Sequence, residues 1–415
     1  MDDVNRRSTP IALELLDGFR VLVIDGPRQA GKSTLVTHVQ ADRGPLVSLD
    51  DPPTLARAVD DPVGFLSDLA PRSAIDEFQR GGSPLLLALK NIVDADRARG
   101  RFLLAGSTRF LTTRRLSDSL TGRVGIVTLL PFSVGEARGV VEQFVDRCFA
   151  GFDVDELRCD RLTRNELASL IVTGGFPEMV LGPSSARFRR SWARSYVDTV
   201  IAPTNVEPVA DLRRHELLPG MLQQLAARSA QELVISDVAR ELVVDEGTTR
   251  SYLEVLETLF VVRHLPGWTS SQTNRAKRRR KVHLVDTAIA CGVLNVSESL
   301  LVGAGAEMFG PLVESFVVAE LVKQAQWCDD PTTLSHYRDR DGHEVDIILE
   351  RGREIVGIEV KASATPLPSD AKNLAYLRDR IGSRFKGGVV LHAGTHQTPL
   401  GDRIVALPIS ALWSP

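Results

Sequence analysis

Two glycines, a lysine and a serine near the N-terminus have types and a spacing that suit phosphate binding. They fall in the stretch 26–33, which fits the pattern G-x-x-x-x-G-K-[ST] without a mismatch. Glycines let backbone N–H groups curl around a phosphate, and a following helix N-terminus adds positive potential. Lys32 is expected to reach the β- and γ-phosphates of ATP, and the Ser33 hydroxyl to bind Mg²⁺. The residues expected to bind the nucleotide here are Gly26, Pro27, Arg28, Gln29, Ala30, Gly31, Lys32, Ser33 and Thr34.

An acidic pair at the end of a short apolar strand supplies the second part of this chemistry. The strand covers residues 73–75, and Asp76 and Glu77 follow it directly. Asp76 is expected to hold Mg²⁺ through water, and Glu77 to polarise the water that attacks ATP. Acidic pairs are common at solvated strand ends, so the pair alone is weak evidence. The P-loop upstream makes a catalytic role for it the favoured interpretation.

Two more candidates lie beside later strands of the same region. Ligands of an open α/β sheet sit off the carboxyl ends of its strands, so Ser107 or Thr108, after the strand at 102–105, is expected to sense the γ-phosphate. A simple strand-end turn is the alternative. Arg123, before the strand at 124–129, is a candidate to neutralise transition-state charge, from its own chain or from a neighbouring subunit. A solvated arginine is the alternative.

These residues require a parallel sheet with connecting helices to position them. The apolar run 21–24 is expected to be the strand that leads into the P-loop, and 34–37 the start of the helix after it. A strand at 46–50 and an amphipathic helix at 85–93 complete the pattern. The sequence therefore predicts an α/β nucleotide-binding core.

The middle of the chain shows a different pattern, typical of a winged helix. Helices are expected at 217–227, 236–242 and 248–259, and strands at 260–265 and 282–285. The third helix of such a motif can enter a DNA major groove. This one carries Arg250 but also three glutamates that would repel phosphates, so a packing role is favoured over base reading.

The densest charge of the chain runs from 275 to 281. Because the net charge is −3, any contact with nucleic acid must come from such a local patch. A basic arm can contact phosphates without reading sequence, and a solvated loop is the alternative. The residues expected to contact DNA are Lys277, Arg278, Arg279 and Arg280.

The C-terminal region carries acidic residues and a lysine in the order of a PD-(D/E)xK nuclease site. Asp346 opens one expected strand at 344–349, and Glu359 and Lys361 end the next at 355–361. Asp346 and Glu359 are expected to bind Mg²⁺, and Lys361 to orient or activate water against a phosphodiester. Glu314, with Glu320 as the alternative, is expected to complete the metal shell from a helix at 311–327. All three strand residues are expected within a few ångströms of each other, whether or not the site cuts.

Composition narrows the setting of this chain. Its cysteines show no C-x-x-C spacing and indicate neither a zinc site nor a disulfide framework, so a reducing, cytoplasmic location is expected. The acidic start at 1–3 has no apolar segment behind it, so no signal peptide is expected. No apolar run approaches the roughly 20 residues of a membrane span, so no membrane association is expected.

Taken together, the motifs resemble a known family. The segments 26–34, 75–80, 104–109, 122–123, 130–133 and 174–178 run in an order similar to that of the AAA+-type ATPases that carry a C-terminal DUF4143 domain. The resemblance covers nearly the whole chain and implies an ATP-binding core, a winged-helix region and a nuclease-like C-terminal domain. It also implies a helical lid, in which one of Arg187, Arg189, Arg190 and Arg194 lies near the nucleotide, with a solvated basic face as the alternative. The chain departs from the family at 202–205, where an Arg-Asp pair is expected.

The fold expected is α/β, with a P-loop core at 1–160, a helical lid at 161–210, a winged-helix region at 211–299 and a nuclease-like domain at 300–415. Two functions remain open. In the first, an ATPase with ATP and Mg²⁺ as cofactors couples nucleotide state to DNA handling, with metal-dependent nuclease activity as an addition. In the second, the chain is a nucleotide-dependent module that binds a partner and whose nuclease-like domain is a non-cutting scaffold. The partners considered are DNA, further copies of the chain and an unidentified protein.

Overall fold

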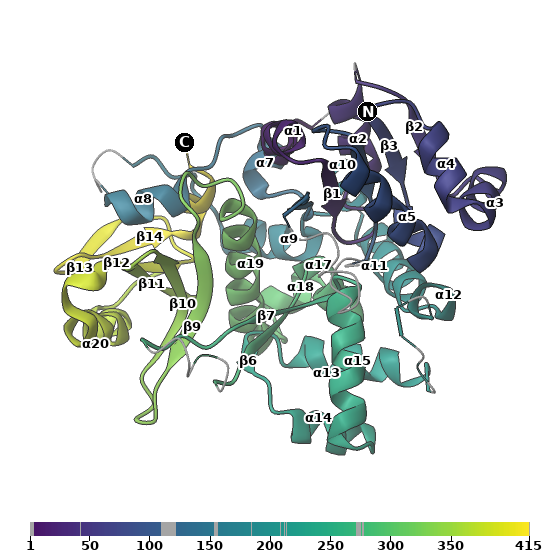
Figure 1. The fold of residues 1–415 in the computed structure, drawn as a ribbon. Helices are drawn as coiled ribbons and strands as arrows, with labels where there is room; N and C mark the ends of the chain where they lie inside the picture. The colour runs from purple at the N-terminus through teal and green to yellow at the C-terminus, as the bar shows by residue number, and fades with distance from the viewer. Residues whose placement is uncertain are drawn as a thin grey trace. The chain divides into compact units, whose positions relative to one another are not determined.

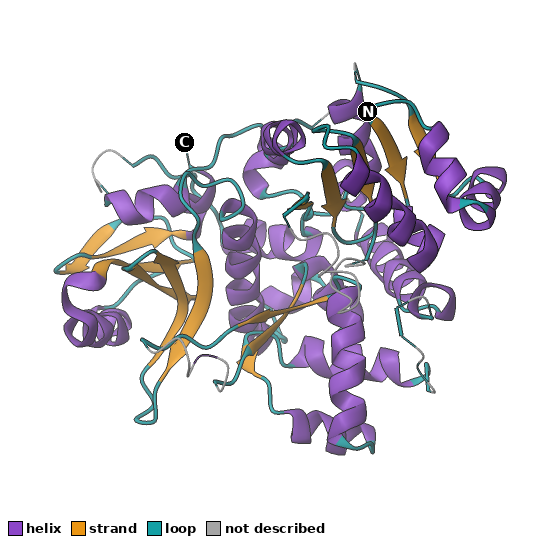
Figure 2. Ribbon diagram, viewed as in Figure 1, coloured by secondary structure: helices purple, strands orange, loops and turns teal. Residues whose placement is uncertain are grey.

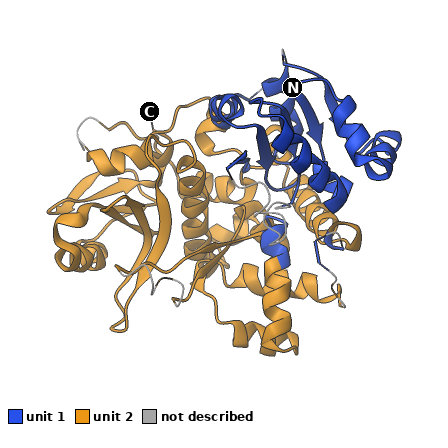
Figure 3. Ribbon diagram, viewed as in Figure 1, with its two compact units in different colours: residues 1–131, 206–211, 255–261 blue, residues 132–205, 212–254, 262–415 orange. Residues whose placement is uncertain are grey.

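The computed structural model describes residues 4–41, 43–108, 122–152, 157–183, 185–207, 209–210, 212, 214–270, 275 and 278–414. The chain divides into two compact units (Figure 3). Unit 1 comprises residues 1–131, 206–211 and 255–261, and unit 2 comprises 132–205, 212–254 and 262–415. Both units combine helices with strands, which confirms the α/β fold class (Figure 2).

Unit 1 is built on a five-stranded sheet with the strand order β2-β3-β4-β1-β5. Its strands β1, β2 and β3 are labelled in Figure 1. All of its strand pairs are parallel, so the carboxyl ends of the strands share one edge of the sheet. Parallel neighbours need crossover connections, and helices supply them. The elements are α1 Ser8–Gly18, β1 Val21–Asp25, α2 Lys32–Gln40, β2 Leu46–Ser48, α3 Pro52–Asp60, α4 Pro62–Asp68, β3 Ser73–Asp76, η1 Phe78–Gly81, α5 Gly82–Ala95, β4 Phe102–Ala105 and β5 Val124–Thr128.

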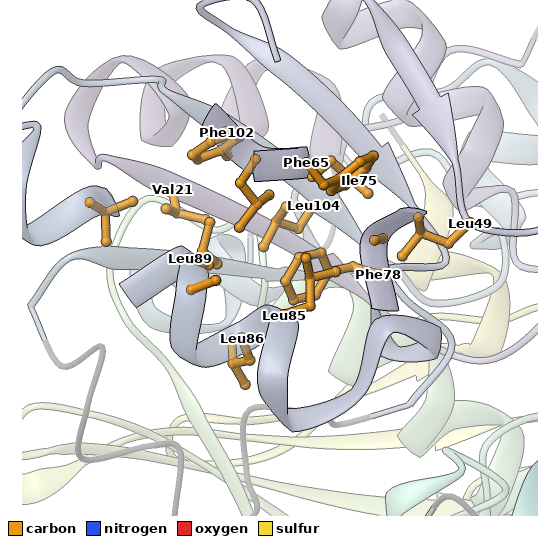
Figure 4. Close-up of a cluster of buried hydrophobic side chains, with 14 of the residues drawn as sticks. Val21, Leu49, Phe65, Ile75, Phe78, Leu85, Leu86, Leu89, Phe102 and Leu104 are labelled. Atoms are coloured by element: carbon orange, nitrogen blue, oxygen red, sulfur yellow. The ribbon is translucent and has the colours of Figure 1, made fainter. Parts of the chain in front are cut away.

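The residues of β1 alternate between two apolar layers. Val21 and Val23 belong to one buried cluster, which contains residues of α3, α4 and α5 (Figure 4). Leu22 and Ile24 belong to another, which contains residues of α1 and α2. A strand that is buried on both faces reads as a continuous apolar run, and this explains why residues 21–24 show no polar alternation.

The first part of unit 2 is mostly helical. Its elements are α7 Val134–Arg138, α8 Phe144–Ala150, α9 Arg164–Thr173, α10 Pro177–Leu181, α11 Ala186–Val200, α12 Pro203–Val206, α13 Leu217–Ala227, β6 Gln231–Glu232, α14 Ile235–Leu242, α15 Glu246–Thr258, β7 Val262–Leu265, β8 Lys281–Leu284, α17 Thr287–Val293 and α18 Glu298–Val302. The divisions between the units pass through the ends of α12 and α15. Strand β8 pairs antiparallel with both β6 and β7. Apart from β6, which lies between α13 and α14, three helices followed by two strands agree with the expected order. The winged-helix assignment stays a prediction.

The second part of unit 2 contains a six-stranded sheet with the order β13-β14-β12-β11-β10-β9. Strands β9, β10 and β11 are antiparallel neighbours, whereas β11, β12 and β14 run parallel. Leu374 and Leu377 of α20 pack into a core with Ile348 of β10, and α19 contacts β11. The elements are η3 Ala306–Met308, α19 Phe309–Gln324, β9 Thr333–Arg338, β10 Glu344–Arg351, β11 Glu354–Lys361, η4 Pro368–Ala371, α20 Lys372–Ile381, η5 Gly382–Arg384, β12 Phe385–His392, β13 Thr398–Gly401, β14 Ile404–Pro408 and η6 Ile409–Trp413.

The structure departs from the expected organisation in two places. The helix expected at 311–327 instead spans Phe309–Gln324 as α19, and α18 and η3 precede it. The first segment of unit 1 ends at Pro131, whereas the ATPase core is expected to end at 160, so residues 132–160 lie in unit 2. The division into four domains stays a prediction. Among the helices of the described ranges, none has the length and apolar character that a membrane crossing requires.

Candidate functional site

The P-loop has a backbone shape that its glycines make possible. Gly26 leaves β1 with a φ of 143°, and a Cβ there would lie 2.2 Å from the carbonyl oxygen of Leu129. Gly31 has a φ of 94° and precedes α2. Only glycine adopts such angles without strain. The buried Arg6 guanidinium donates to the carbonyl oxygens of Ala30 at 2.9 Å and Leu130 at 2.5 Å, so a residue before α1 braces the loop.

Lys32 begins α2 with its ammonium turned back into the loop. Its Nζ donates to the carbonyl oxygens of Gly26 at 3.1 Å and Pro27 at 2.7 Å, and the residue is buried. Burial lowers the pKa of Lys32 to about 8, although Glu77 and Asp76 act in the opposite direction. A phosphate in the loop would supply the negative charge that this buried ammonium lacks.

The Ser33 hydroxyl lies against the first acidic residue after β3. Ser33 Oγ donates to Asp76 Oδ2 at 2.7 Å. Oxygens on adjacent corners of an octahedral Mg²⁺ site are about 3 Å apart, given Mg–O distances of about 2.1 Å. This spacing suits a single Mg²⁺ ion, and the expected role of Asp76, holding the ion through water, stays a prediction.

Glu77 is held in place from two sides. Ser107 Oγ donates to Glu77 Oε1 at 3.0 Å, and Gln79 Nε2 donates to Glu77 Oε2. The backbone of Glu77 has a φ of 52°, in the left-handed region that non-glycine residues seldom adopt. Strain of this kind costs on the order of 1–3 kcal/mol and clusters at functional sites. The structure thus brings together the ends of β1, β3 and β4, as the order of strands requires.

Arg123 and Thr34 differ in where they lie relative to the phosphate site. Arg123 precedes β5, whereas the P-loop follows the parallel neighbour β1, so Arg123 lies at the opposite end of the strands. There it pairs with Asp94 at 2.7 Å. A role for Arg123 at the phosphate site of its own chain is therefore wrong, and a role toward a neighbouring subunit stays a prediction. Thr34 is exposed in the first turn of α2, next to Ser33.

In unit 2, the predicted nuclease-like residues gather where β10 and β11 begin to separate. The ladder between these strands starts at Ile347 and Ile358, one residue past Asp346 and Glu359. Asp346 Oδ2 instead accepts the N–H of Val360 at 2.9 Å. Lys361 Nζ donates to Glu359 Oε2 at 2.8 Å. Between Val345 and Ile348 the pairing of β10 with β9 shifts register, and such bulges re-aim side chains next to active sites.

A lysine outside the predicted motif lies in the middle of this group. Lys281, the first residue of β8, places its Nζ 2.8 Å from Glu314 Oε1, 2.8 Å from Glu344 Oε1 and 3.3 Å from Asp346 Oδ1. Of the two helix glutamates considered, Glu314 joins the group. Glu320 instead pairs with Lys323 at 2.7 Å and accepts the N–H of Val134. In the sequence, Lys281 directly precedes an apolar strand, and this position could have indicated a buried lysine. Because Lys281 also ends the basic run 275–281, the sequence did not distinguish it from the exposed residues of that run.

The arrangement does not fit a metal ion held by Asp346 and Glu359 as predicted, because an ammonium already contacts Asp346. In the described part of the chain, the set of His, Cys, Asp and Glu ligand atoms that lie within 4.8 Å of one another belongs to Asp339, Asp341 and His343 instead. The Asp339 carboxylate there already accepts hydrogen bonds from Tyr376 and Tyr337 and from the N–H of His343. No step of a reaction is assigned to a metal in unit 2.

The predicted nucleic-acid residues divide between described and undescribed positions. Arg278, Arg279 and Arg280 are exposed and lead directly into β8. Lys277 lies outside the described residues. A contact of these residues with DNA stays a prediction.

The remaining family motifs join into a buried polar network of unit 2. The Lys323 ammonium donates to the carbonyl oxygen of Phe132 at 2.8 Å, and Asp286 accepts the N–H of Gly175 at 2.8 Å. Ser133 Oγ donates to the buried carboxylate of Glu142 at 2.6 Å. Residues 132–133 and the segment 174–178 therefore have a structural explanation within unit 2.

Comparison with known proteins matches three stretches of the chain to protein families. Residues 18–138 match the family described as AAA domain, 164–300 match a domain of unknown function, DUF8612, and 309–412 match another, DUF4143. The chain carries an AAA domain and a DUF4143 domain. The AAA domain contains the P-loop and the acidic pair, and the DUF4143 domain contains Glu314, Asp346, Glu359 and Lys361.

Two curated relatives are uncharacterized proteins of Mycobacterium tuberculosis and Mycobacterium bovis. Each is 29% identical to this chain over 393 residues, which make up 94% of this chain and 80% of the relative. Among solved structures, a Walker-type ATPase of Pyrococcus abyssi is 15% identical, with a TM-score of 0.45, over 71% of this chain and 96% of its own. RuvB of Thermotoga maritima is 18% identical, with a TM-score of 0.31, over 63% of this chain and 88% of its own.

Proposed function

We propose that this chain hydrolyses ATP with Mg²⁺ at the phosphate site of unit 1. The observation that carries the proposal is the convergence of Lys32, Ser33, Asp76 and Glu77 at the carboxyl ends of β1 and β3, the parallel strands on either side of β4. Lys32 and the N–H groups of the loop bind the phosphates, and Ser33 and Asp76 hold Mg²⁺, which neutralises charge on the phosphates. Glu77 polarises a water molecule for attack on the γ-phosphate.

Hydrogen bonds support this role for Glu77. Both of its carboxylate oxygens accept hydrogen bonds, from Ser107 and from Gln79, so the side chain is oriented before substrate binds. Preorganised groups of this kind lose little freedom on reaching the transition state.

The test separates binding from turnover. Lys32→Ala is expected to abolish ATP binding, measured by titration calorimetry, because its ammonium contacts the phosphates. Glu77→Gln is expected to keep binding and to lower kcat by about 100-fold or more, because general-base catalysis typically contributes at least this much. Asp60→Asn, an exposed change on α3, serves as the control. Wild-type turnover in Glu77→Gln would refute the catalytic assignment.

For unit 2 we propose a module that responds to nucleotide state and handles DNA or a protein partner without cutting. The ammonium of Lys281 among the carboxylates of the nuclease-like site favours this scaffold role over metal-dependent cleavage. A cleavage assay with Mg²⁺ or Mn²⁺, with and without ATP, tests it on wild type and on Asp346→Ala. Cleavage by wild type that Asp346→Ala abolishes would contradict the scaffold role.

A further inference from the structure

The cluster around Lys281 is an unusual place for a lysine. Its side chain is 2% exposed, and the three carboxylates that contact it come from α19 and β10. Buried lysines are rare unless they are paired. This one makes three ion pairs at 2.8 to 3.3 Å and thereby ties β8 to the helix and sheet of the DUF4143 domain.

Charge explains why a cation must lie there. Glu314, Glu344 and Asp346 would repel one another without a positive group between them. Burial alone lowers the pKa of Lys281, but Glu314, Asp346 and Glu344 together raise it above its ordinary value, so the side chain stays charged. Burial first, and the neighbouring Asp346 second, raise the pKa of Glu314 to about 8, although Lys281 acts in the opposite direction.

The same oxygens are the ones that a divalent ion would use. Asp346 Oδ1 contacts Lys281, and Asp346 Oδ2 accepts the N–H of Val360, so a metal bound to Asp346 Oδ1 would share that oxygen with the ammonium. A divalent ion binds oxygens at about 2.0–2.6 Å and would lie beside the Lys281 ammonium, with strong repulsion between the two. The ammonium and the metal therefore exclude each other.

We propose that the Lys281 ammonium is the resident cation of the Glu314, Glu344 and Asp346 cluster and excludes divalent metal ions from it. This inference deepens the proposed scaffold role of the DUF4143 domain and rests on it. The three carboxylates together form a site that suits a cation, and the Lys281 side chain of β8 occupies it. It follows that removing the ammonium creates a site for a divalent ion.

The experiment measures Mn²⁺ binding to the full chain by titration calorimetry in the absence of nucleotide. Lys281→Met, which keeps length but removes charge, is expected to bind Mn²⁺ at least about tenfold more tightly than wild type, because a repelling charge is gone. The additional change Glu314→Gln is expected to cancel this gain. Lys372→Met, an exposed lysine of the same domain, is the control and is expected to behave as wild type.

Thermal unfolding guards against a variant that folds poorly. Since three carboxylates lose their cation, Lys281→Met is expected to unfold at a lower temperature than wild type, and Mn²⁺ is expected to restore the loss in this variant alone. Equal Mn²⁺ affinity in wild type and variant would overturn the proposal. So would a variant that stays unfolded both with and without Mn²⁺. DNA cleavage by wild type is a separate result, which would contradict the scaffold role.

Discussion

Ser107 Oγ donates a 3.0 Å hydrogen bond to Glu77 Oε1, and this contact joins the carboxyl ends of β4 and β3. The sequence predicts that Ser107 or Thr108 senses the γ-phosphate. In the structure, Ser107 instead contacts the residue proposed to polarise water. We therefore infer that Ser107 acts through Glu77, as a positioning residue.

Ser107→Ala is expected to lower kcat by about tenfold while ATP affinity changes little, because small displacements of a catalytic group have large kinetic effects. Steady-state kinetics separate the two quantities. Ser107→Thr keeps a hydroxyl and is expected to retain more activity than Ser107→Ala. If Ser107→Ala weakens ATP binding and leaves kcat unchanged, the residue contacts the nucleotide and not Glu77.

ATP affinity is expected to fall as pH rises above about 8. Burial lowers the pKa of Lys32 to about 8 in the free protein, and bound phosphates are expected to raise this pKa again. At a pH between these two pKa values, ATP binding is therefore accompanied by the uptake of a proton by Lys32. The affinity is therefore expected to fall by up to about tenfold per pH unit there. Calorimetry in two buffers of different ionisation enthalpy measures the proton uptake. Lys32→Arg stays charged and is expected to lack the effect if it binds ATP.

Neutralising Lys277, Arg278, Arg279 and Arg280 is expected to weaken DNA binding and flatten its salt dependence. Each phosphate contact contributes about 0.9 to the slope of log K against log salt concentration for duplex DNA. Fluorescence anisotropy at several salt concentrations gives the slope. Neutralising the exposed Lys372, Arg380 and Lys386 changes the net charge by a similar amount and is the control. Equal slopes in wild type and variant would mean that the run is a solvated loop.

Unit 2 is expected to lose stability between about pH 4.5 and 8 because of Glu142. Burial first, and the neighbouring Glu320 second, raise the pKa of Glu142 to about 8. The folded state then binds a proton that the unfolded state releases, so the free energy of unfolding falls as pH rises, by at most about 1.4 kcal/mol per unit for one proton. Glu142→Gln is expected to reduce this slope in denaturant titrations, and exposed Glu307→Gln is not. A slope unchanged by Glu142→Gln would contradict the assignment.

The sequence by itself determined the elements whose chemistry is local. A P-loop requires glycines at fixed positions because of backbone angles, and Gly26 and Gly31 have those angles. The mainly apolar runs before the P-loop and before Asp76 predicted strands, and both strands are present. The separation of Glu359 and Lys361 by one residue placed them together on a strand, and an ion pair joins them.

Only the tertiary structure decided which of the predicted residues contact one another. It also decided which of them contact Lys281, a residue outside the predicted motifs. Arg123 has the right neighbours in sequence but precedes a parallel strand, which puts it at the wrong end of the sheet. Glu314 and Glu320 lie on one helix, where Glu320 pairs with its i+3 neighbour Lys323, whereas only packing brings Glu314 to Lys281. Lys281 lies 33 residues from Glu314 and 65 from Asp346 along the chain. Local periodicity carries no information over such distances, because the pairing of these charges depends on how β8, α19 and β10 pack.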